Sequence, residues 1–189
     1  MNLCVLVGSL RKASFSGMLA NALISLAPPS MEPEIVEIGQ MPLYNQDLER
    51  LIDPPPAPWT AFRQRVKAAD AVLFVTPEYN RSVPAVLKNA LDVGSRPYGS
   101  SVWDRKPGAI VSGSPGAIGA FGANHHLRQS LVFLNMPTMQ QPEAYLSHVD
   151  KLFDEHGRLV NDGTSKFLQQ FMQAFANWVQ TIRSQGQHV

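Results

Sequence analysis

Residues 3–16 read LCVLVGSLRKASFS, five apolar residues followed by a loop of small, polar and basic residues. An uninterrupted apolar run that includes Val5 and Val7 is typical of a strand buried on both faces of a parallel sheet. Gly8 lets the backbone turn at the end of this strand, and a helical pattern follows. The segment therefore predicts a strand, a loop and a helix, the opening unit of an α/β fold.

The loop after this strand has the composition of a phosphate-binding site. Hydroxyl groups and a forked cation stand just before the helix: Ser9, Arg11, Ser14 and Ser16. The first N–H groups of a helix lack intrahelical acceptors and carry partial positive charge, so they attract anions. The alternative interpretation is that a serine only caps the helix and that Arg11 faces solvent.

Composition and charge restrict the classes of protein to which the chain can belong. The 189 residues suffice for one full-sized core, so we expect a single domain over residues 1–189. A net charge of +1, with no cluster of Lys and Arg, does not support binding to nucleic acid. Neither a signal peptide nor a membrane span is evident, and we expect a cytoplasmic protein. The single cysteine, Cys4, is predicted to fill the core.

Apolar runs alternate with helical patterns along the chain. Strands are predicted at residues 3–7, 34–38, 71–76, 108–112 and 136–140. The strand at 34–38 alternates polar with apolar residues and is expected near an edge. Helices are predicted after the first loop and at residues 59–69, 84–93, 123–134 and 164–183. Residues 40–58 are expected to be irregular, because their proline cluster forbids helix. The alternation indicates a doubly wound, five-stranded parallel sheet with helices on both faces.

Informative polar residues follow three of these strands at their carboxyl ends, where doubly wound sheets bind ligands. Ser9–Ser16 follow the first strand, residues 77–84 (PEYNRSVP) the third, and residues 112–119 (SGSPGAIG) the fourth. The first loop suits a phosphate, and the other two present backbone amides and a planar wall to a flat guest. A phosphate joined to a flat heteroaromatic ring describes flavin mononucleotide, FMN.

Several motifs resemble the NAD(P)H-dependent FMN reductases of the chromate and quinone reductase type. They are GSLRKASF at 8–15, TPEYN at 76–80, SVPAVLKNA at 82–90 and HLRQ at 126–129. The resemblance covers nearly the whole chain and implies a flavodoxin-like fold, non-covalent FMN, and a homodimer or homotetramer that completes the flavin sites. It also implies that NADH or NADPH reduces FMN at N5, after which quinones, or chromate, azo and nitro compounds, take two electrons in a ping-pong cycle. The chemistry belongs to the cofactor, so no catalytic side chain is assigned.

The resemblance also implies which residues hold FMN. The phosphate loop would contribute Ser9, Arg11, Ser14, Phe15 and Ser16. The ribityl chain and one side of the ring would be lined by Pro77, Glu78, Tyr79 and Asn80. The pyrimidine end would be approached by Ser112, Gly113 and Ser114, whose N–H groups would stabilise negative charge on the reduced ring. The helix carrying residues 88–90 would lie at the dimer seam.

Some positions depart from the family's usual residues, and they bear on acceptor range more than on flavin binding. Asn is common at Ser16, an aromatic at Arg81, glycine at Ala85 and Val86, and Trp at Val93. The choice between NADH and NADPH stays open, because Arg81 and Arg128 could each meet a 2′-phosphate, face solvent or contact a neighbouring subunit.

Two other functions are consistent with the same motifs. A flavin reductase would release reduced FMN to a partner monooxygenase, and a flavodoxin-like carrier would have no turnover of its own. Such carriers are usually strongly acidic, so the net charge of +1 argues against the second. Glu78 is either a general acid or an anchor of its turn, and the anchor is favoured because flavin hydride transfer needs no protein acid. No metal site is predicted, since the neighbours His125 and His126 would point about 100° apart on a helix.

Overall fold

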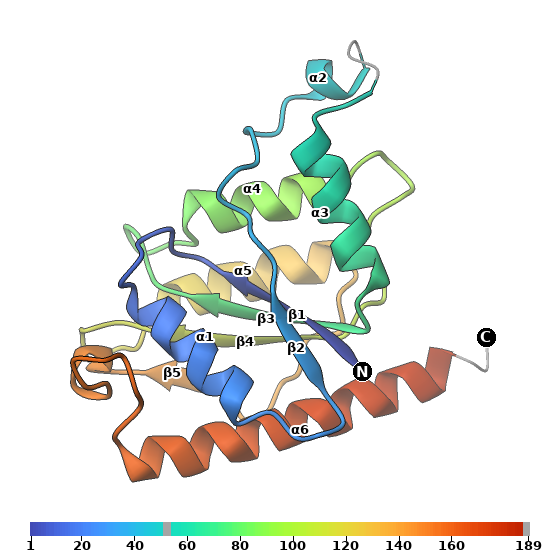
Figure 1. Cartoon of the computed structure of the whole chain (residues 1–189). Coiled ribbons are helices and arrows are strands. Elements are labelled where there is room, and N and C mark those ends of the chain that lie inside the picture. Colours follow the sequence, from blue (N-terminus) through green and yellow to red (C-terminus); the bar gives the residue numbers. More distant parts are fainter. Residues whose placement is uncertain (51–53, 187–189) are drawn as a thin grey trace.

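The computed structural model describes residues 1–50 and 54–186, which form a five-stranded parallel sheet between helices (Figure 1). The strand order is β2-β1-β3-β4-β5. The strands are β1 (Asn2–Val7), β2 (Glu32–Ile35), β3 (Ala71–Thr76), β4 (Gly108–Gly113) and β5 (Ala144–Leu146). This order confirms the predicted flavodoxin-like, doubly wound fold.

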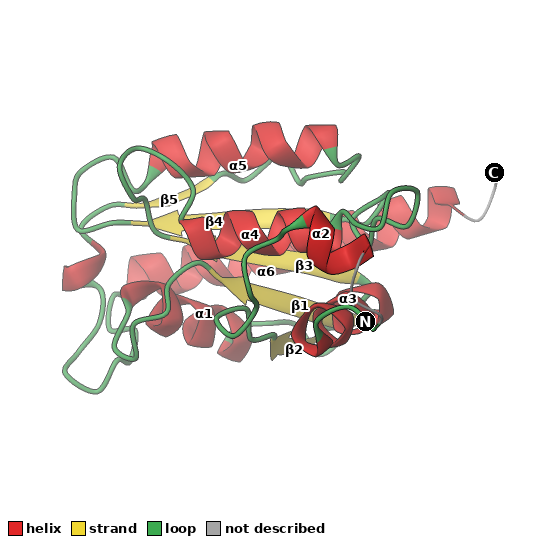
Figure 2. Cartoon of the chain, turned by 90° about the horizontal axis from the view of Figure 1, so that it is seen from above, coloured by secondary structure: helices red, strands yellow, loops and turns green. Residues whose placement is uncertain are grey.

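The helices form one layer on each face of the sheet (Figure 2). One face is covered by α1 (Phe15–Ser25) and α6 (Asp162–Gly186), and the other by α3 (Ala57–Ala68), α4 (Ala85–Gly94) and α5 (Phe121–Phe133). A short helix α2 (Gln46–Arg50) precedes α3, and a 3-10 turn η1 spans Val149–Lys151. Within the described residues, no helix is both long and apolar enough to cross a bilayer.

Alternate residues of the central strands reach opposite cores. In β1, Leu3 and Val5 pack toward α1 and α6, whereas Cys4 and Leu6 pack toward α3 and α4. Every residue of β3 is buried, as the continuous apolar run predicted. Cys4 is 3% exposed, which confirms that it fills the core.

The second strand is shorter and begins earlier than predicted. Residues 32–35 pair with residues 2–5 of β1, and Val36 adds one further hydrogen bond, from its N–H to the Val5 carbonyl. Beyond it, Ile38 is buried in the core under α3, so its alternation with polar neighbours reflects core packing rather than strand pairing. The predicted edge position is confirmed, and Pro33, which has no N–H, suits an edge.

The predicted fifth strand at residues 136–140 is wrong, because β5 is Ala144–Leu146. The earlier segment makes one isolated bridge, between Gly108 and Thr138. Its apolar residues Met136 and Met139 are buried in the two cores, and this burial explains the strand-like composition. Pro137 interrupts the segment and has no N–H to donate to a ladder.

The segment 40–58 is less irregular than expected. It contains α2, and α3 begins at Ala57, with Pro58 in its first turn. Proline is tolerated there because the first N–H groups of a helix have no intrahelical acceptor. Residues 51–53 lie outside the described part of the chain.

Candidate active site

The three predicted loops lie at one edge of the sheet. Strands β1, β3 and β4 are neighbours and run parallel, with Val7 beside Val75 and Thr76 beside Ser112. Their carboxyl ends therefore meet, and the order β2-β1-β3 makes β1 and β3 the place where the chain connections switch sides. Ligands of doubly wound sheets bind at such a point. In Figure 2 loops extend beyond the arrowheads of the strands.

The loops after β1 and β3 contact each other closely. The Gly8 N–H donates to the Val75 carbonyl at 2.8 Å, and a Cβ on Gly8 would lie 3.1 Å from Pro77 Cδ. Beside this contact is an open cavity of about 410 Å³, here called the β1–β3 groove. It is lined by Gly8, Leu10, Arg11, Tyr79, Pro84, Ala85 and Val86.

The phosphate loop combines a helix cap with unused donors. The Ser14 Oγ accepts a hydrogen bond from the Gly17 N–H at 3.0 Å, so the capping interpretation holds for this serine. The N–H groups of Phe15 and Ser16 lie in the same first turn, where a helix supplies no acceptor of its own. Arg11 is exposed, and within residues 1–50 and 54–186 no carboxylate pairs with it.

The loop after β3 forms a tight turn over Tyr79–Ser82, here called the Tyr79–Ser82 turn. Its two end residues exchange backbone hydrogen bonds of 3.0 and 3.1 Å. Asn80 and Arg81 between them adopt left-handed conformations, with φ of 51° and 64°. The Tyr79 side chain is half exposed and lines the β1–β3 groove.

The Glu78 side chain does not line this groove but contacts α5. Its Oε2 accepts a hydrogen bond from the Ala123 N–H of α5 at 3.0 Å, and its Oε1 lies 3.5 Å from the Arg81 guanidinium. Its side chain is only 10% exposed. The carboxylate is thus an anchor, as the favoured interpretation expected, although it anchors the turn to a helix 45 residues farther along.

The loop after β4 differs from the prediction in detail. Ser112 is fully buried, and its Oγ donates to the Gly119 carbonyl at 2.8 Å and accepts from Asn124 Nδ2 at 3.2 Å. The Ser114 N–H donates to the Leu146 carbonyl. These groups are therefore already used within the chain, whereas residues 115–118 at the tip of the loop are exposed. The predicted loop 112–119 included this tip, but the site residues assigned from the sequence ended at Ser114, although the Pro115-Gly116 pair was a turn signal.

A match to a known family decides the class of this protein. Residues 1–151 match the family model of the NADPH-dependent FMN reductases. The chain belongs to this family. As a member, it is an oxidoreductase of a family whose cofactors are FMN and NAD(P)H.

This FMN reductase family member is similar to proteins that carry names of their own. It is 59% identical to a quinone reductase of Pseudomonas putida over 183 residues, which cover 97% of each chain. It is 48% identical to a 2-hydroxy-1,4-benzoquinone reductase of a Burkholderia species, over 97% of this chain and 98% of the other. The solved structure of FerB, a flavoenzyme NAD(P)H:(acceptor) oxidoreductase from Paracoccus denitrificans, matches with a TM-score of 0.88 and 39% identity, over 95% of this chain and 97% of FerB.

The residues of this reductase fit FMN. A phosphate would find an exposed cation and helix-terminal N–H groups in one loop, which are the donors that phosphates prefer. The groove beside them has mostly apolar walls and suits a flat ring. A contact within the protein supports this fit. Gly8 has no side chain, which lets the loop after β1 lie close to Pro77 in the loop after β3.

Two further predictions for the reductase can be compared with the structure. Arg128 donates to Asn124 Oδ1 at 3.0 Å and to the Met139 carbonyl at 3.1 Å, so it links α5 to the segment before β5. Arg81 remains exposed. In the stretch expected at the dimer seam, Asn89 and Ala90 are buried within the chain and only Lys88 is exposed.

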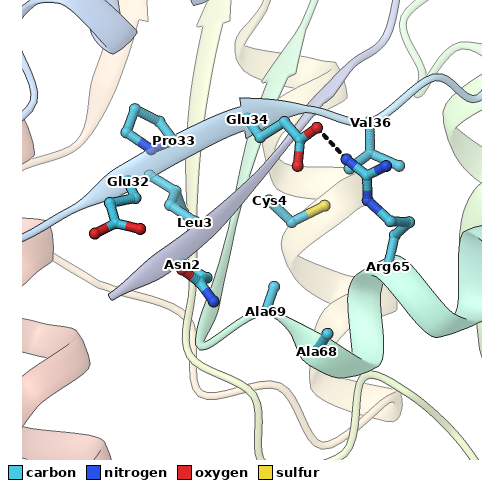
Figure 3. A pocket seen from close by; sticks show the side chains of 10 residues that line it. All are labelled: Asn2, Leu3, Cys4, Glu32, Pro33, Glu34, Val36, Arg65, Ala68 and Ala69. Carbon is cyan, nitrogen blue, oxygen red and sulfur yellow. Dashed lines mark ion pairs between the residues drawn. The ribbon is translucent and has the colours of Figure 1, made fainter.

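A second cavity, of about 380 Å³, lies near the start of β1, between β2 and the end of α3 (Figure 3). Arg65 and Glu34 form an ion pair at this cavity, and Cys4 lines it. Burial raises the pKa of the Cys4 thiol to about 12, so the thiolate that would react is scarce near neutral pH. This cavity lies near the start of β1, away from the carboxyl ends of the strands where the three loops meet.

Proposed function

We propose that this protein transfers two electrons from NADH or NADPH to quinones, with FMN bound at the carboxyl ends of β1, β3 and β4. The observation that carries the proposal is the 59% identity, over 97% of both chains, to a protein named quinone reductase. The three loops that meet at the switch point support it, because they offer a phosphate site and a groove for a ring.

The phosphate loop would hold the charged end of FMN. Arg11 would supply a forked, charge-assisted contact, while Ser9 and the N–H groups of Phe15 and Ser16 would add hydrogen bonds. Ser14 would act indirectly, because its Oγ caps the helix and keeps those N–H groups pointing outward.

The other two loops would hold the ring and the ribityl chain. Pro77, Tyr79 and Asn80 would form one wall, and Gly113, Ser114 and the loop tip at 115–118 the other. When bound, FMN would supply the two-electron centre, which NAD(P)H and the acceptor would use in turn. Protein N–H groups near the ring would stabilise its negative charge without reorganisation.

The acceptor would bind against the flavin ring in the β1–β3 groove, whose lining favours an apolar molecule. Leu10, Pro84, Ala85 and Val86 contribute hydrocarbon surface, and Arg11 is the only charged residue that lines it in the described part of the chain. Quinones suit such a lining better than the chromate ion does. We propose chromate as a secondary acceptor, and azo and nitro compounds likewise. We place the reaction in the cytoplasm, where NAD(P)H is available.

We further propose that the protein is a homodimer or homotetramer. Tyr98, Val132 and Phe133 are 92%, 77% and 90% exposed, and Tyr98 and Phe133 line the same surface groove. Large apolar side chains that stand this far into solvent mark interaction surfaces.

Absorption spectroscopy of the purified protein tests the proposed function. We expect a yellow preparation whose flavin band is bleached by anaerobic NADH or NADPH and restored by a quinone. A colourless preparation that binds no added FMN would refute the proposal. Flavin that survives gel filtration would exclude a flavin reductase that releases FMN, and NAD(P)H oxidation with a quinone would exclude a carrier without turnover.

A further inference from the structure

We propose that Glu78 is a positioning residue that caps α5 from a distance and thereby fixes the spacing between the two walls of the flavin site. The inference rests on the proposed function, because it assigns a role in FMN binding. It concerns a side chain that does not line the β1–β3 groove.

Helix α5 has no side-chain cap of its own. Its N-cap residue is Ala120, in a left-handed conformation with φ of 61°. The alanine side chain has no atom that could accept a hydrogen bond. The first N–H groups of a helix need an acceptor or solvent. Glu78 Oε2 meets this need by accepting from the Ala123 N–H at 3.0 Å, and a carboxylate is the acceptor that the positive end of a helix favours.

The space for this carboxylate depends on a glycine in α5. A Cβ on Gly122 would lie 2.9 Å from Glu78 Oε2 and 3.1 Å from the Arg81 carbonyl oxygen. The first turn of α5 and the Tyr79–Ser82 turn are therefore in direct contact. The contact brings the loop after β3 against the helix that follows the loop after β4.

A second link lies on the other side of the Tyr79–Ser82 turn. His126 Nδ1 lies 3.1 Å from Ser82 Oγ, one helical turn after the Glu78 contact. Glu78 and Ser82 therefore bracket the left-handed residues Asn80 and Arg81. A turn with two non-glycine residues in this region is strained, and it persists only where its surroundings hold it.

These contacts join the two walls of the proposed flavin site. Tyr79 stands on the turn that Glu78 holds, whereas the tip at 115–118 belongs to the loop that leads into α5. If the link is lost, the turn is free to move relative to the start of α5, which Asn124 still joins to Ser112 of β4, and the site no longer has a defined width. The bound ring would then lose contacts on both sides, and FMN would bind more weakly.

The experiment compares Glu78→Ala, Glu78→Gln and His126→Ala with Glu155→Ala. Glu155 is an exposed carboxylate in the hairpin before α6 and serves as the matched control. The readouts are the FMN dissociation constant from flavin fluorescence, the reduction potential of the bound flavin, and the pH profile of kcat at saturating FMN. Thermal unfolding of each protein without FMN is measured in parallel.

We expect Glu78→Ala to lower the affinity for FMN at least tenfold and to change the reduction potential of the bound flavin. Glu78→Gln, whose amide oxygen still accepts a hydrogen bond, and His126→Ala should each weaken FMN about threefold, as expected for the loss of part of a hydrogen-bond link. The pH profile of kcat should keep its shape in Glu78→Gln, and Glu155→Ala should bind FMN like the wild type.

Two results would overturn the inference. The first is wild-type FMN affinity in Glu78→Ala, which together with a lower unfolding temperature would show a purely structural role. The second is a hundredfold loss of kcat in Glu78→Gln together with loss of one limb of the pH profile, which would show a general acid. If Glu78→Ala does not fold, the threefold effects in the other two variants decide. A wild-type protein that binds no FMN would instead refute the proposed function.

Discussion

Gly8 at the end of β1 stands against Pro77 at the end of β3, so close that a Cβ on the glycine would lie 3.1 Å from Pro77 Cδ. This contact sets how near the phosphate loop comes to the wall of the ring site. Thr76 Oγ1 lies 3.2 Å and Leu87 Cδ2 3.4 Å from the same Cβ position, so several neighbours would crowd a side chain there.

We therefore expect Gly8→Val to damage both stability and flavin binding. Overpacking at this junction should lower the free energy of unfolding by about 1–3 kcal/mol and reduce the FMN that remains bound after gel filtration. Urea unfolding and the ratio of flavin to protein absorbance measure the two effects. The control is Gly163→Ala in α6, where the nearest atom to the new Cβ would be Asn161 Oδ1 at 3.4 Å. Full flavin content in Gly8→Val would contradict the assigned role of this contact.

Arg11→Ala should lower FMN affinity tenfold or more. A charge-assisted contact to phosphate is worth about 1.5–3 kcal/mol, and Arg11 is exposed with no carboxylate partner in the described chain, so its removal should not affect the fold. Fluorescence titration with FMN, and with riboflavin as a phosphate-free ligand, gives the measurement. The charge-matched control is Lys166→Ala on the exposed side of α6. Equal effects of Arg11→Ala on FMN and riboflavin would exclude a phosphate contact.

Phe133→Glu should dissociate the oligomer. Its ring is 90% exposed in the single chain, so the substitution costs no core packing but places a charge on the apolar surface. Light scattering after size-exclusion chromatography should show a smaller mass for the variant than for the wild type. Val160→Glu, at another exposed apolar position, should keep the wild-type mass. A monomeric wild type would refute the proposed assembly.

Cys4 should make the stability depend on pH in the alkaline range. Burial raises the pKa of its thiol from 9.0 to about 12, against a smaller opposing effect of Lys106. Between these values the unfolded chain loses the thiol proton while the folded chain keeps it, so stability falls as the pH rises. Well below pH 9 both states keep the proton, and this group has no effect.

Urea unfolding of the wild type and of Cys4→Ala measures this effect. The variant loses core packing at every pH, but the stability gap between the two proteins should narrow from neutral pH to about pH 11. Tyr145, whose pKa burial also raises to about 12, contributes equally to both proteins. A gap of constant size would show that the thiol does not titrate in this way.

The central strands could be predicted from the sequence because they are buried on both faces. Such strands leave uninterrupted apolar runs, and the predicted residues 71–76 coincide with β3. Residues 136–140 were wrongly predicted to be a strand. Met136 and Met139 are buried in the two cores, although the segment does not form a strand of the sheet. Amino-acid composition indicates which residues are buried, but it does not indicate which backbone groups hydrogen-bond to each other.

The sequence by itself determined the layered α/β fold, the family and the three loops that carry the polar residues, because periodicity and motifs are local properties of the chain. Only the tertiary structure decided how those loops are held. Glu78 accepts a hydrogen bond from a helix 45 residues away, and the Ser112 hydroxyl is hydrogen-bonded to Gly119 and Asn124 inside the protein. Such contacts depend on the distances between separate elements. The packing of the sheet and helices sets these distances, and a local sequence pattern does not contain them.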